Sequence, residues 1–140
     1  MISGYLKPLT LYVFICDPPL KGDITWAVAS FGDVVEKHIV LPSRRLDLER
    51  VATPWYGYIF SNEIVDRTAR ESLPAYFEQK NWECVVMMKK ELNGDELIVT
   101  QAPRLFRTDV RLQEGLLIPE GDPKAERMLD GWILDNASLR

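Results

Sequence analysis

Residues Thr53 to Asp66 read TPWYGYIFSNEIVD and contain the clearest buried strand of the sequence. The centre of this stretch, Trp55 to Phe60, is mostly aromatic and apolar, which is typical of a strand that is buried on both faces. The run stops at Ser61-Asn62-Glu63, where three oxygen-bearing side chains follow one another. Such a cluster at a strand end predicts either a binding site or an ordinary polar connection to the next helix.

Strand and helix patterns alternate on both sides of this stretch. Hydrophobic periodicity predicts strands at residues 9–17, 34–42, 55–61, 82–92 and 95–102, a further short strand within 104–112, and helices at 21–33, 43–52, 68–77 and 122–135. The strongest local signal is Asn93-Gly94, the preferred pair for a tight turn between two strands. In the last segment, apolar residues recur at helical spacing after Asp122-Pro123, which favours an amphipathic helix that docks on the core.

This order of elements predicts an α/β protein with one domain over residues 1–140. We expect a three-layer α/β/α architecture with a mixed, mainly parallel central sheet, a core at 9–112 and a C-terminal docking helix at 122–135. In open α/β sheets, ligands bind beyond the carboxyl ends of the strands. The predicted site therefore involves Asp17, residues 42–47 and Ser61–Glu63.

The composition of the chain argues against nucleic-acid binding and against a membrane span. The 140 residues carry a net charge of −4, which argues against a nucleic-acid partner. No apolar run approaches the ~20 residues of a membrane span, and the first residues lack the features of a signal peptide, so we expect a cytoplasmic protein. Cys16 and Cys84 lie in apolar runs and are expected to be reduced, buried thiols.

Three segments together resemble the nucleotide-sugar half of an inverting family 2 glycosyltransferase with the GT-A fold. The first, IVLPSRRLDLERVATPW (39–55), matches the family pattern at Ser43 and Asp47. In the second, WYGYIFSNE (55–63), Asn62 and Glu63 stand at the end of the family's Asp-x-Asp-Glu run. The third, APRLFRTDVRL (102–112), is similar to the Arg-Leu-Phe-Arg segment of many members.

The resemblance implies a nucleotide-sugar donor, an acceptor of unknown identity and a divalent cation, Mn²⁺ or Mg²⁺. Carboxylates suit such hard cations, which offset the charge of a departing diphosphate. The residues that it implies for nucleotide-sugar binding are Asp17, Ser43, Asp47, Ser61, Arg104 and Arg107, with Asn62 and Glu63 as metal ligands. The weak candidates for a catalytic base are Asp109, Glu114 and Glu120, and nothing in their spacing singles one out.

The sequence departs from the family pattern at two positions, one implied to bind the metal and one implied to bind the nucleotide base. Phe60 replaces the first aspartate of the Asp-x-Asp pair and cannot coordinate a metal. Pro42 replaces an aspartate that the family is implied to use on the nucleotide base, and proline offers neither a carboxylate nor an N–H.

Two hypotheses follow. The first is a compact glycosyltransferase that needs a homodimer or a partner subunit, contacted through the C-terminal helix, to complete its acceptor side. The second is a non-catalytic binding or regulatory domain that has lost the metal site.

Overall fold

The computed structural model describes residues 7–15, 22–42, 46, 48, 51–79, 81–113 and 116–135. Its elements are β1 (Leu9–Phe14), α1 (Asp23–Ser30), the short 3₁₀ helix η1 (Gly32–Val34), β2 (Val35–Leu41), β3 (Trp55–Phe60), β4 (Glu63–Val65), α2 (Arg67–Glu78), β5 (Cys84–Asn93), β6 (Glu96–Arg107) and β7 (Ala125–Asp135). The helix expected at 43–52 falls mostly outside the described residues.

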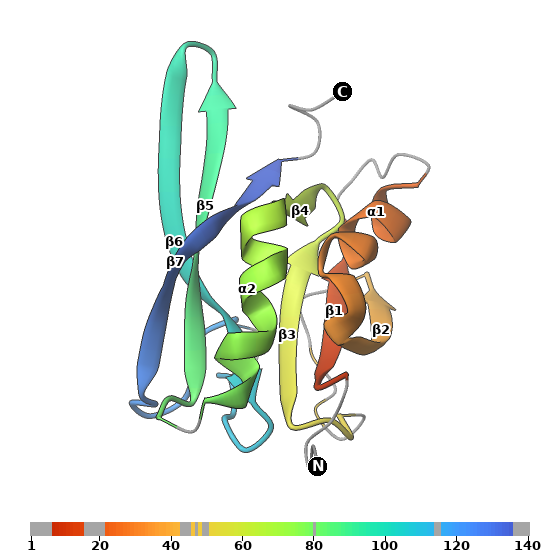
Figure 1. Cartoon of the computed structure of the whole chain (residues 1–140), viewed down its shortest axis with the longest axis vertical. Coiled ribbons are helices and arrows are strands. Elements are labelled where there is room, and N and C mark those ends of the chain that lie inside the picture. Colours follow the sequence, from red (N-terminus) through yellow and green to blue (C-terminus); the bar gives the residue numbers. More distant parts are fainter. Residues whose placement is uncertain are drawn as a thin grey trace.

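All seven strands belong to one sheet, in the order β2-β1-β3-β6-β5-β7-β4 (Figure 1). β1 pairs in parallel with β2 and β3, as expected for the first three strands. β6 is antiparallel to both β3 and β5, whereas β7 is parallel to β5 and antiparallel to β4. The sheet is therefore mixed, with as many antiparallel as parallel pairings.

The expected three-layer α/β/α architecture is wrong, because both described helices pack on the same face of the sheet. Ala27 of α1 and Leu73 of α2 belong to one buried cluster, together with Leu11 of β1 and Ile59 of β3. We call this side of the sheet the helix face. The structure is thus mostly one curled sheet with two helices on one side.

The opposite face, which we call the loop face, has its own buried cluster. Tyr12, Tyr56 and Phe106 from three neighbouring strands form its centre. Their cover comes from residues of the connecting segments, including Val51 and Leu112. The central strands are therefore buried on both faces, as their continuous apolar sequences predicted, but loops take the place of the second helical layer.

The C-terminal docking helix expected at 122–135 is also wrong, because residues 125–135 form strand β7. Met128 and Ile133 are its fully buried apolar residues, whereas Leu129 is 70% exposed. An irregularity in the pairing with β5 separates the two buried positions and lets both face the helix side. β7 pairs with β5 on one edge and, at Ile133 to Asp135, with β4 on the other, so tertiary context overrides the helical periodicity.

The hairpin predicted around Asn93-Gly94 is confirmed. Asn93 pairs with Glu96, and Gly94 opens the turn with a φ of +67°. The far half of this hairpin, residues 91–98, extends beyond the helices and the other strands (Figure 1). We call the segment of β5 and β6 from residue 88 to residue 101 the arm.

The tightest contact between a helix and the sheet involves Gly131 of β7, whose φ is +121°. A Cβ at this position would lie 2.3 Å from the backbone nitrogen of Ala69 and 2.6 Å from Oδ1 of Asp66. Asp66 is the N-cap of α2 and accepts a hydrogen bond from that same nitrogen at 2.9 Å. Glycine at 131 is therefore needed both for its backbone angle and for the close approach of α2.

We predict that Gly131→Ala lowers the free energy of unfolding by about 2–4 kcal/mol, because it combines backbone strain with a backbone clash. Gly121→Ala is the matched control, since Gly121 also has a positive φ, of +73°, but no atom within 4 Å of an added Cβ. Strain alone should cost about 1 kcal/mol there. Chemical denaturation measures both, and equal losses would contradict the packing argument.

Candidate functional site

The most distinctive polar feature of the described residues is the carboxylate of Glu63, which is fully buried at the start of β4. Its Oε1 accepts hydrogen bonds from Nη1 of Arg104 at 2.7 Å and from the backbone N–H of Phe60 at 2.9 Å. Its Oε2 accepts hydrogen bonds from Nη2 of Arg104 at 3.0 Å and from Nζ of Lys89 at 2.6 Å. We call these three charged side chains the Glu63 network.

The network lies where two parts of the sheet separate. β3 pairs with β6 only at Trp55 to Gly57, opposite Leu105 to Arg107. Arg104 is the next residue of β6, and it is the extra residue at an irregularity in the pairing with β5. Its guanidinium group lies over the rings of Tyr58 and Phe60, at 4.8 and 5.5 Å from the ring centroids. Arg104 thus bridges the diverging strands.

Gly57 makes this arrangement possible. An added Cβ at Gly57 would lie 2.6 Å from the backbone oxygen of Arg104 and 2.6 Å from a methyl carbon of Leu105. The glycine in the middle of an otherwise bulky strand therefore lets β6 approach closely at the last pairing before the strands part.

The electrostatics of Glu63 reflect two opposing causes. Burial disfavours the charged carboxylate, but its hydrogen bonds and ion pairs with Arg104, and then with Lys89, outweigh burial and hold the pKa of Glu63 below its ordinary value. For Arg104, burial likewise opposes the charge, and the contacts with Glu63 raise its pKa above the usual range. Both groups are therefore ionised at neutral pH.

The other residues of the predicted site have internal roles or lie apart. Ser61 is buried, and its backbone N–H donates to the carbonyl of Phe14 at 2.8 Å. Asn62 is half-buried in the turn before β4. Arg107 lies over the ring of Trp55 and donates to backbone carbonyls of the segment after α2.

The candidates for a catalytic base are not close to Glu63. Asp109 and Glu120 line a shallow hollow beside the amino end of β3, where Thr108 donates a backbone hydrogen bond to Pro54. Glu63 follows the carboxyl end of the same strand, so the length of β3, about 17 Å, separates the two places. Asp17, Ser43, Asp47 and Glu114 lie outside the described residues.

The described residues do not fit a divalent metal at Asn62 and Glu63. Both oxygens of Glu63 already accept charge-assisted hydrogen bonds, and a metal ion there would stand beside two cations. Among the described residues, no group of three or more His, Cys, Asp and Glu side chains is arranged to hold a metal ion. The geometry matches a structural ion-pair network instead.

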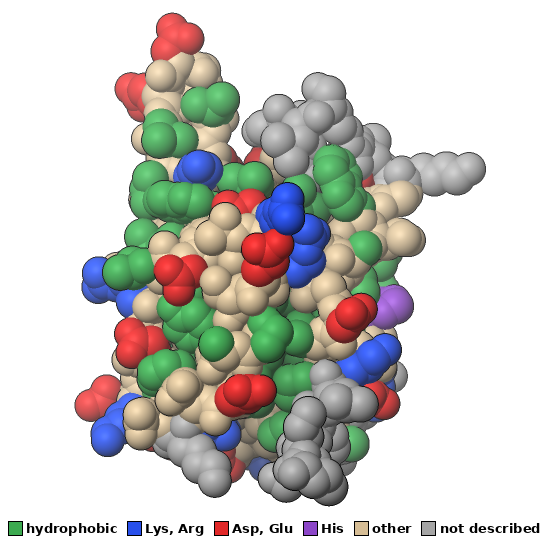
Figure 2. Space-filling model, in the orientation of Figure 1, with side chains coloured by type: hydrophobic (Ala, Val, Ile, Leu, Met, Phe, Trp, Pro, Cys, Tyr) green, Lys and Arg blue, Asp and Glu red, His purple; other side chains and the backbone are tan. Residues whose placement is uncertain are grey.

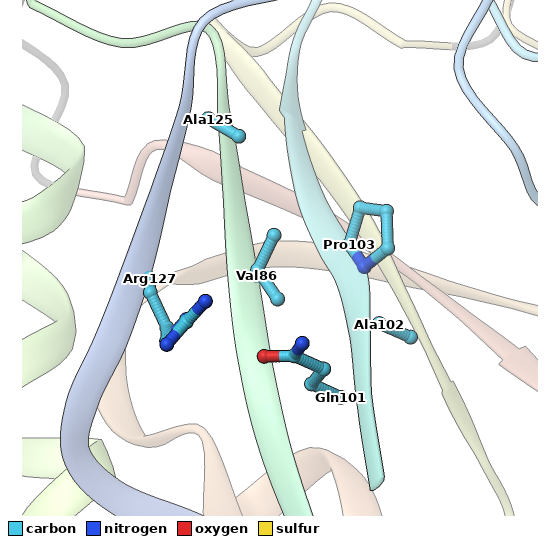
Figure 3. Close-up of a pocket in the computed structure, with 6 residues that line it drawn as sticks. All are labelled: Val86, Gln101, Ala102, Pro103, Ala125 and Arg127. Carbon is cyan, nitrogen blue, oxygen red and sulfur yellow. The ribbon is translucent and has the colours of Figure 1, made fainter.

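A second hollow, of about 330 Å³, lies over β7, β5 and β6 near the base of the arm (Figure 3). Arg127 and Gln101 are its polar side chains, and the rest of the lining is small and apolar. It offers no nucleophile and no acid–base pair among its lining residues, so it does not carry chemistry.

Lys89 was not singled out from the sequence as a residue of the site. Strand alternation could have predicted this role, because Lys89 lies on the same face of β5 as Val85 and Met87. Both of these residues are buried on the helix face. A lysine in register with core residues indicates a buried partner carboxylate. Only the curl of the sheet reveals that this partner is Glu63.

No protein-family model matches the chain, and no curated protein sequence matches it either. None of the helices in the described part of the chain has the length and apolar character of a membrane span. The resemblance to family 2 glycosyltransferases therefore remains a prediction from the sequence segments alone.

We predict that Glu63→Gln lowers the free energy of unfolding at pH 7 by about 3–5 kcal/mol, because it leaves the charge of Arg104 buried without its partner. Glu71→Gln is the matched control, since Glu71 forms an exposed ion pair with Arg67 and its loss should change stability little. Equal effects of the two substitutions in urea denaturation would refute the structural role of the network.

The same network predicts a pH dependence. Since the pKa of Glu63 is lower in the folded state than its ordinary value of 4.5, its ionisation stabilises the fold above that pH. The contribution is lost as the pH falls below about 4.5 toward the folded-state pKa. Denaturation series at several pH values should show a steeper loss in this acidic window for the wild type than for Glu63→Gln.

Proposed function

We propose that the protein is a non-catalytic binding domain whose ligand is a protein chain. The observation that carries this proposal is the occupation of the Glu63 carboxylate by Arg104 and Lys89, at the position where the resemblance implies a metal ligand. A donor site of the implied kind needs a carboxylate that is open to a cation. Here the carboxylate contributes to folding instead.

The energetics of displacement support this proposal. To bind a metal, Glu63 would have to release Arg104, which is only 6% exposed. Leaving that guanidinium buried and unpaired would cost about 3–5 kcal/mol, before the repulsion between the metal and Lys89 is counted. The separation of Asp109 and Glu120 from Glu63 also argues against a single catalytic centre among the described residues.

The surface of the arm supports a protein ligand. Leu92, Leu97 and Val99 are 65%, 60% and 47% exposed. Leu92 faces Leu97 across the hairpin, and Val99 lies two residues further along β6, so the three side chains share one side. Figure 2 shows hydrophobic side chains gathered along the arm. Exposed apolar residues that adjoin one another in this way are typical of a protein interface.

Thermal unfolding with and without nucleotide-sugars and Mn²⁺ tests the proposal. We expect no midpoint shift that requires the metal, whereas a ligand at 100 times its dissociation constant would add about 2.7 kcal/mol of stability. The panel should include nucleoside diphosphates and nucleotide-sugars with different bases.

The outcome against the proposal is a stabilisation that requires both a nucleotide-sugar and Mn²⁺ and that disappears in Asn62→Ala. That result would favour sugar transfer, and product analysis with candidate acceptors would then identify the reaction. Asn62 is the better probe here because replacing Glu63 destabilises the fold itself.

A further inference from the structure

The arm has an open backbone edge. Within the described residues, β3 reaches β6 only at Leu105 to Arg107, so residues 96–103 of β6 pair with β5 alone. The hairpin is closed by Asn93 and Glu96, so Glu96 and every second residue after it direct their backbone N–H and C=O groups toward β5. The intervening residues, Leu97, Val99 and Gln101, direct their backbone N–H and C=O groups away from β5. This row of donors and acceptors is a template for one more strand.

The outer part of the edge lacks the charged side chains and prolines that usually prevent such pairing. Residues 97–102, LIVTQA, contain neither, and Pro103 ends this stretch. Most of them are β-branched or apolar, which favours strand addition. The edge also extends away from the helices, so the main body of the protein does not cover its outer half (Figure 1).

From this edge we infer that the arm pairs with the arm of a second copy of the chain, β6 against β6, in antiparallel orientation about a two-fold axis. The inference rests on the proposed function, since it names the partner of the arm. An antiparallel pair of identical edges is self-complementary and closes as a dimer.

The sequence of β6 favours one register. With the axis at Val99, Leu97 of each copy faces Gln101 of the other, and every outward-pointing residue in this set has an N–H to donate. Moving the axis by one residue, to Thr100, would place Leu97 opposite Pro103, which has no N–H. In the Val99 register Glu96 faces Ala102, so no like charges meet, and the exposed side chains of Leu97 and Val99 adjoin those of the other copy.

Sedimentation velocity over about 1 to 200 µM protein tests this inference, because a small interface is expected to give a dimer in the micromolar range. We expect a reversible monomer–dimer equilibrium. Val99→Pro should weaken it at least roughly tenfold, since it removes both central N–H donors of the dimer and leaves the bonds to β5 intact. Leu129→Lys is the matched control, as it removes an apolar residue that is 70% exposed but lies on β7.

Cysteine cross-linking checks the register. In the expected dimer the two copies of residue 99 face each other with Cα atoms about 5.5 Å apart, within reach of a disulfide. The two copies of residue 97 lie about 14 Å apart, which is too far. Under mild oxidation Val99→Cys should form a covalent dimer, whereas Leu97→Cys and the wild type should not.

A protein that stays monomeric over the whole concentration range would overturn the inference. So would a dimer that Val99→Pro leaves unchanged, or one that Leu129→Lys disrupts as strongly. These outcomes are distinct from a failure of the proposed function, which is measured by metal-dependent binding of nucleotide-sugars and does not involve the arm.

Discussion

The buried ion pair between Glu63 and Arg104 links parts of the sheet that are far apart in the sequence. It joins β4 to β6 at the place where β3 and β6 separate, and Lys89 of β5 completes it. A buried carboxylate is tolerated only with such full compensation. The curl of the sheet, the place of β4 at its far edge and the position of α2 over β7 are all compatible with this arrangement.

Both described helices lie on one face of the sheet, and neither of them covers the arm. The loop face is covered near β1 and β3, but the arm extends past both clusters. The hairpin therefore keeps exposed apolar residues on one side and an open backbone edge along β6. The Glu63 network is buried and stabilises the fold, whereas the arm is exposed and available for contacts. We therefore assign folding to the network and protein binding to the arm.

Much of the local structure could be predicted from the sequence. The buried strand at Trp55 to Phe60 and the turn at Asn93-Gly94 are as expected, because their signals are local. The C-terminal strand could not be predicted, since Ala125 to Ile133 has a helical period and only pairing with β5 and β4 selects the extended form. The Glu63 network could not be predicted either, because Lys89 and Arg104 lie on strands that are far from Glu63 in the sequence.

A double-mutant cycle on Glu63→Gln and Arg104→Met, measured by urea denaturation at pH 7, tests whether the two buried side chains stabilise the fold as a pair. Each single change leaves one buried polar group without its partner, whereas the double variant removes the pair. We expect a coupling free energy of about 2–3 kcal/mol between the two positions. A coupling below about 0.5 kcal/mol would mean that the two side chains act independently. Glu63 would then be free to serve another ligand, and the structural account of the site would be wrong.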